Sequence, residues 1–139
     1  MAPMIGRWRA QADSAMGPVT CERSFARILG EKYVQLDAVW KFGGGKGAAG
    51  GYREHAIFGA DTDGVLTFWS FTSDGKRSQG RIATAADVHA RALCFEAQMD
   101  AGLARQIYWP DETDGVHWAV EARNKSGWRR FTEHHYRAE

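Results

Sequence analysis

Cysteine is scarce in this sequence: Cys21 and Cys94 are the only two in 139 residues, and they lie far apart. A disulfide framework needs more cysteines, and a zinc site needs several Cys or His ligands at short spacing. The histidines are dispersed too, and no Cys-x-x-Cys or His-Glu-x-x-His motif occurs. We therefore expect two small buried thiols and no metal site.

Net charge and long apolar runs are also lacking. The formal net charge at pH 7 is +1, which creates no field to attract nucleic acid or an anionic membrane. No apolar run approaches the length of a membrane span, and the first residues lack the basic and apolar regions of a signal peptide. We expect a cytoplasmic protein without nucleic-acid or membrane partners.

Catalytic motifs are missing as well. A hydrolase needs a nucleophile, a base and an orienting acid within reach of one another, and no serine here lies in a nucleophile elbow. The glycine-rich stretch 42–51 lacks the Gly-Lys-Ser/Thr ending of a phosphate-binding loop, so we expect a flexible hairpin loop there. We predict no catalytic residues, and the sequence favours binding over catalysis.

Aromatic residues and two-residue periodicity are what the sequence has in abundance. Aromatics make up 12% of the chain and include six tryptophans, and large rings favour strands. The clearest alternation is residues 65–72, where Val65, Thr67, Trp69 and Phe71 share one face. Asp-Gly pairs on both sides of this segment are strong hairpin signals. The segment is therefore predicted as a strand between two tight turns.

The same pattern recurs along the chain and predicts about ten strands. Their expected ranges are 5–11, 19–28, 32–42, 52–58, 65–72, 77–84, 89–98, 103–109, 116–123 and 128–137. The seventh range lies in an alanine-rich segment that could also be helical, and Leu93 and Phe95 alternating with Cys94 and Glu96 favour a strand. We predict one all-β domain over residues 1–139, an antiparallel up-and-down barrel, because closure removes exposed strand edges. Pattern alone leaves a sandwich open.

The first predicted strand carries Gly6-Arg7-Trp8, and this Gly-x-Trp resembles the signature of calycins, the group that includes lipocalins. The resemblance implies that Trp8 closes one end of a barrel and that an arginine of the last strand, here Arg137, packs across its ring. Antiparallel pairing of the first and last strands would bring these residues together. Few residues precede Gly6, so any helix plugging that end is absent or very short.

A broader pattern resembles the DUF1579 domain, a bacterial family of unknown function with a lipocalin-like barrel. The residues that carry this resemblance are 51–71, Gly80, Phe95, Glu96, Tyr108, Trp109, Gly127, Trp128, Tyr136 and Arg137. The pattern spans nearly the whole chain and contains no catalytic motif, so it bears on fold more than on function.

A barrel of this size either fills with side chains or holds a small ligand. We predict a site for a small apolar or aromatic molecule. Its candidate walls are Trp40, Phe58, Phe68, Trp69, Phe71, Phe95, Tyr108 and Trp118. Its candidate polar anchors are Glu54, Arg91, Glu96 and Arg105. The alternative is a packed interior without a cavity, in a protein that forms a homodimer through exposed aromatics.

His134 and His135 suggest a third possibility. Adjacent strand residues face opposite ways, so one of the two imidazoles points into the barrel. A late-strand histidine of this kind resembles the haem ligand of nitrobindin-type barrels, which also have an N-terminal Gly-x-Trp. The plain alternative is a hydrogen-bonded or surface histidine, and no other cofactor is expected.

Overall fold

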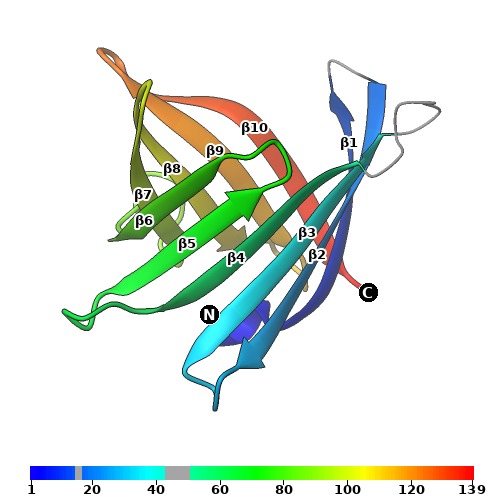
Figure 1. The fold of residues 1–139 in the computed structure, drawn as a ribbon. Coiled ribbons are helices and arrows are strands. Elements are labelled where there is room, and N and C mark those ends of the chain that lie inside the picture. The colour runs from blue at the N-terminus through cyan, green and yellow to red at the C-terminus, as the bar shows by residue number, and fades with distance from the viewer. Residues whose placement is uncertain (15–16, 43–50) are drawn as a thin grey trace.

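The computed structural model describes residues 1–14, 17–42 and 51–139. Ten strands follow one another, each hydrogen-bonded to the next in antiparallel fashion, and β1 pairs with β10 to close a barrel (Figure 1). The strands are β1 (Gly6–Ser14), β2 (Gly17–Ile28), β3 (Tyr33–Phe42), β4 (Tyr52–Ala60), β5 (Leu66–Thr72), β6 (Arg77–Ala83), β7 (Leu93–Met99), β8 (Gly102–Pro110), β9 (Val116–Asn124) and β10 (Gly127–Ala138). The predicted all-β, up-and-down barrel is confirmed.

Closure depends on the pairing of the two ends of the chain. Trp8 lies opposite Ala138, and Arg9 lies opposite Arg137, so the first and last strands share a ladder and the sheet has no free edge there. This pairing excludes the open sandwich. The backbone N–H of Glu139 also donates to the carbonyl of Arg7, at 2.9 Å.

The predicted Asp-Gly turns form as the sequence indicates. Between β4 and β5, Asp61 Oδ1 accepts hydrogen bonds from the backbone N–H groups of Asp63 and Val65. Gly64 follows with φ of +78°, and Gly75 occupies the equivalent place before β6 with φ of +84°. Both positions need a residue that tolerates positive φ, which glycine does at little cost.

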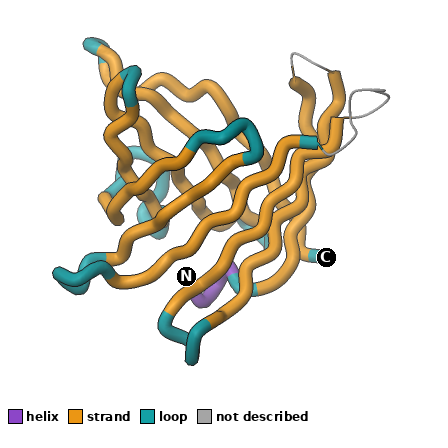
Figure 2. The backbone as a smooth tube through the Cα atoms, in the orientation of Figure 1, coloured by secondary structure: helices purple, strands orange, loops and turns teal. Residues whose placement is uncertain are grey.

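A short helical turn closes the end of the barrel near the N-terminus. The 3-10 helix η1 (Ala2–Met4) is the only helical element among the described residues (Figure 2), and its three residues agree with the expectation of an absent or very short plug. Met4 is buried, and the indole Nε1–H of Trp8 donates to its carbonyl at 2.8 Å. None of the described helices is long and apolar enough to be a membrane span.

The predicted stack of Arg137 on Trp8 is wrong. Residues that face each other across the β1–β10 ladder point to the same side, and Trp8 faces Ala138 while Arg137 faces Arg9. The guanidinium of Arg137 therefore lies outside the barrel, where it donates to Asp111 Oδ2 at 2.7 Å. Trp8 does lie inside at the closed end, as the resemblance implies, but Met4 covers it instead.

Strand β7 begins four residues later than predicted, at Leu93 instead of His89. Residues 84–92 form turns that pack on the outer face of the barrel. There, buried Ala85 lies with Cys94 of β7 and Ile107 of β8 in a second hydrophobic cluster, separate from the main core. The glycine-rich loop predicted at 42–51 falls largely on residues 43–50, outside the described residues.

Candidate functional site

The barrel interior is divided along its axis into a packed lower part and an open upper part. Below, Met4, Trp8, Phe25, Phe58 and Val116 belong to one buried cluster. Above, near the ends of β3, β7 and β9 and the starts of β4, β8 and β10, a cavity of about 610 Å³ remains. That volume is in the usual range for pockets that hold small molecules.

The cavity is lined mainly by apolar and aromatic side chains. Six of the predicted wall and anchor residues take part: Trp40, Glu54, Phe68, Phe95, Arg105 and Trp118. Further lining residues that the sequence did not single out include Phe42, Tyr52, Ala97, Val120 and Ala122. The tight approach of Phe68 to Gly80 shapes one wall, since a Cβ on Gly80 would lie 2.3 Å from the Phe68 ring.

Phe58 and Tyr108 are inside the barrel but not among the residues that line the cavity. Both are almost fully buried in the main core. Phe58 packs against the rings of Phe68 and Phe95, with centroids 5.9 Å and 5.2 Å apart. Their role is to fill the space under the cavity, so they support its walls instead of forming them.

The prediction that Trp69 and Phe71 line the barrel is wrong. Within β5 the inward side chains are Phe68 and Ser70, which are buried, whereas Phe71 is 53% exposed. Both faces of this strand carry large apolar residues, so alternation alone could not assign the inner face. The outward aromatic Phe71 is the kind of residue on which the predicted homodimer rests.

A buried arginine lies directly below the cavity. Arg23 of β2 is 2% exposed, and its Nε–H and Nη1–H donate to the hydroxyls of Tyr136 and Tyr108 at 3.0 Å and 2.8 Å. Its guanidinium carbon lies 4.2 Å from the ring centroid of Trp118 and 5.4 Å from that of Trp40. These two indoles form part of the cavity wall, so Arg23 is the layer behind that wall.

Glu54 of β4 is the acidic partner of Arg23. Its Oε1 lies 4.0 Å from Arg23 Nη1, and its Oε2 accepts a hydrogen bond from Ser70 Oγ at 2.5 Å. Opposite charges at this distance inside a barrel attract strongly, which offsets part of the cost of burying the guanidinium. Burial alone would lower the pKa of Arg23. The nearby Tyr108, Tyr136 and Glu54 act in the opposite direction, and the pKa of Arg23 is raised above its usual value. Glu54 is thus an acidic group in a wall that is mainly apolar.

Sequence reasoning missed Arg23, the most deeply buried charged residue of the site. The signal was present, because Val19, Cys21, Arg23 and Phe25 alternate on one face of β2 and the first, second and fourth are plainly apolar. An arginine in the middle of such a face means either that the inward face has been assigned wrongly or that the arginine is buried with a partner.

His134 points into the barrel and His135 points out. Burial lowers the pKa of His134 to about 4, and the Arg23 charge acts in the same direction. Its Nδ1 lies 3.2 Å from the hydroxyl of Tyr136, and its Nε2 lies 3.9 Å from Cys21 Sγ. Burial raises the pKa of the Cys21 thiol to about 11, so the thiol and the imidazole are both neutral at pH 7 and do not form a reactive ion pair.

Neither histidine fits the role of a haem ligand. Both ring nitrogens of His134 face protein partners, and His134 is not among the described residues that line the cavity. His135 stacks on His117 outside the barrel, with ring centroids 4.2 Å apart, and hydrogen-bonds to Asp111. In the described part of the chain, no group of three or more His, Cys, Asp and Glu side chains is arranged to hold a metal ion.

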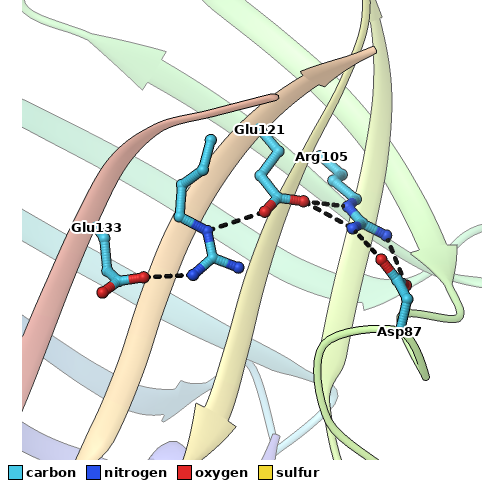
Figure 3. A network of polar contacts seen from close by, with 5 residues as sticks. Asp87, Arg105, Glu121 and Glu133 are labelled. Carbon is cyan, nitrogen blue, oxygen red and sulfur yellow. Dashed lines mark hydrogen bonds and ion pairs between the residues drawn. The ribbon is translucent and has the colours of Figure 1, made fainter. Parts of the chain in front are cut away.

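The charged groups of the other predicted anchors, Arg91, Glu96 and Arg105, do not point into the cavity. Arg105 binds Asp87 and Glu121, and Glu121 also binds Arg130, which in turn contacts Glu133 (Figure 3). This network ties the outer turns at 84–92 to the barrel wall. Glu96 lies opposite Arg105 on the same face of the β7–β8 pair, and Arg91 is exposed in the outer turns.

The neutral state of His134 predicts a dependence of stability on pH. The unfolded chain binds a proton near pH 6.5 and the folded barrel near pH 4, so stability falls as the pH drops through this window. The expected slope is at most about 1.4 kcal/mol per pH unit. Urea unfolding of wild type and His134→Gln at pH 7 and pH 5 measures it, and equal losses in the two proteins would contradict the assignment.

These features define a class of protein: a closed ten-stranded antiparallel barrel with a plugged lower end and a largely apolar cavity above. Comparison of the chain with protein-family models and with curated proteins finds no match. The resemblance to the DUF1579 domain therefore stays a prediction, and the cavity is the feature that bears on function.

Proposed function

We propose that this barrel binds a small, largely apolar or aromatic molecule in its upper cavity. The observation that carries the proposal is the cavity of about 610 Å³ beside a lower half that is already packed. Apolar walls with a few placed polar groups are typical of small-molecule sites. The aromatic side chains Trp40, Phe68, Phe95 and Trp118 supply flat contact surfaces for a ring system.

The two thiols bear on where the protein works. Cys21 and Cys94 are free and buried on opposite faces of the barrel wall, one in the main core and one in the outer cluster. Free buried thiols suit a reducing compartment, and a cytoplasmic location is part of the proposal.

Filling the cavity with a side chain tests the proposal. Ala97 lines the cavity, and its neighbour Gln98 is exposed on the outer face of the same strand. Ala97→Trp is expected to weaken binding of the neutral fluorescent probe N-phenyl-1-naphthylamine at least about tenfold, because the indole occupies the space that the probe needs. Gln98→Trp adds the same ring outside and should leave the affinity unchanged.

The measurement is a fluorescence titration of each protein, with thermal melting to establish that both variants fold. An Ala97→Trp protein that folds and binds the probe as tightly as wild type would contradict the proposal. Native mass spectrometry of the protein as isolated complements the titration, because it reports both a co-purifying molecule and the oligomeric state.

A further inference from the structure

Two polar groups near the cavity have unused hydrogen-bonding capacity. Arg23 Nη2 is buried and has no hydrogen-bond partner among the described residues. Glu54 uses Oε2 to accept from Ser70, while its Oε1 lies 4.0 Å from Arg23 Nη1, too far for a direct hydrogen bond. A donor that is buried without an acceptor is costly, so the site gains from a group that satisfies it.

The position of the pair suggests which part of a ligand meets it. Glu54 lines the cavity, as do Trp40 and Trp118, the two indoles that contact the guanidinium. Arg23 itself is not among the described lining residues, but its Nη1 lies 4.0 Å from Glu54 Oε1. A ligand atom hydrogen-bonded to this oxygen therefore lies close to the guanidinium. The remaining lining residues are mostly apolar, among them Phe42, Val120 and Ala122, so they give the ligand's apolar body contacts away from this pair.

The charges decide the kind of polar group. Arg23 and Glu54 balance each other, and the other titratable side chains around the guanidinium are Tyr108, Tyr136, His134 and Cys21. A carboxylate on the ligand would gain the attraction of Arg23 but would meet the repulsion of Glu54. A neutral group that donates one hydrogen bond and accepts another satisfies both residues at once.

Taking the proposed function as given, we infer that the ligand's buried end is a neutral donor–acceptor group, such as a hydroxyl or a primary amide, hydrogen-bonded to Glu54 beside the Arg23 guanidinium. The pair is then a specificity device: it selects neutral polar aromatics over purely apolar rings and over organic anions.

Four compounds with one ring system test this at pH 7 by isothermal titration calorimetry: naphthalene, 2-naphthol, 2-naphthamide and 2-naphthoate. We expect 2-naphthol and 2-naphthamide to bind about tenfold or more tightly than the other two, since hydrogen bonds to charged groups are the strong ones. Naphthalene that binds as tightly as 2-naphthol overturns the inference and leaves the proposed function standing. If none of the four binds while N-phenyl-1-naphthylamine does, only the inference fails. If that probe does not bind either, the proposed function fails as well.

Removing the Glu54 charge gives a second test, because it should shift the ligand preference towards an anion. Glu54→Gln removes the negative charge and leaves Arg23 uncompensated, so affinity for 2-naphthoate relative to 2-naphthol is expected to rise at least about tenfold. Glu22→Gln is the matched control, because Glu22 precedes Arg23 on β2 but pairs with Lys41 on the outer face. An unchanged preference in Glu54→Gln, or tightest binding of 2-naphthoate by the wild type, overturns the inference.

Discussion

Replacing Arg23 by alanine is expected to lower the free energy of unfolding by about 3–5 kcal/mol. The change leaves a hole among the rings of Trp40 and Trp118, removes the donors to the hydroxyls of Tyr108 and Tyr136, and strands the Glu54 charge. Equilibrium unfolding in urea measures the loss.

The control for this substitution lies on the same strand. Arg27 of β2 is exposed, so Arg27→Ala should change stability by less than about 0.5 kcal/mol. Arg23→Met keeps much of the volume and separates packing from charge, because it leaves the tyrosine hydroxyls and Glu54 without their partner. A loss in Arg23→Ala no larger than that in Arg27→Ala would show that the guanidinium does not organise the middle of the barrel.

The second large effect is expected on the outer face. Arg105 is 3% exposed, donates to Glu121 and twice to Asp87, and lies over the Trp128 ring at 4.3 Å. Arg105→Ala leaves the buried Glu121 with Arg130 as its remaining partner. We expect a loss of about 3 kcal/mol in the free energy of unfolding, measured by urea unfolding as for Arg23.

Asp87 separates the global part of this effect from the local part. Its side chain is 60% exposed, so Asp87→Ala should reduce overall stability by only about 0–1 kcal/mol. It should nevertheless speed amide hydrogen exchange in residues 84–92, whose attachment to the barrel it supplies. If Arg105→Ala and Asp87→Ala lose the same stability, or if exchange in 84–92 changes in neither, the ion-pair network of Figure 3 does not hold this segment on the barrel.

Much of the fold could be predicted because β-strand periodicity and turn chemistry are local. Asp61 and Gly64 set a turn from their own side chain and backbone preferences, and nine of the ten strands begin within two residues of the predicted position. The exception is β7, because the turns at 84–92 that precede it pack on the outer wall through Ala85. Burial there depends on Cys94 and Ile107, which are distant contacts that no local pattern reveals.

The errors at the site have one physical cause. Alternation tells which residues share a face but not which face is the inner one, and Trp69 and Arg137 were both assigned to the wrong side. Trp40 and Trp118 face the cavity as predicted, because their strands carry fewer large apolar residues on the other face. Phe68 was included only because the prediction named aromatic residues on both faces of β5. Arg23 was missed because a buried charge can be recognised only with its partners, and these come from β4, β8 and β10.

The plug formed by Met4 and Trp8 under the barrel has an evolutionary consequence. Because the lower half completes its own packing, substitutions among upper residues such as Ala97, Val120 and Ala122 leave that foundation intact. Large-to-small changes around an existing void also forfeit fewer contacts than changes in a dense interior. Descendants of this chain can therefore change ligand specificity through single substitutions, each of which leaves enough stability for the domain to remain folded.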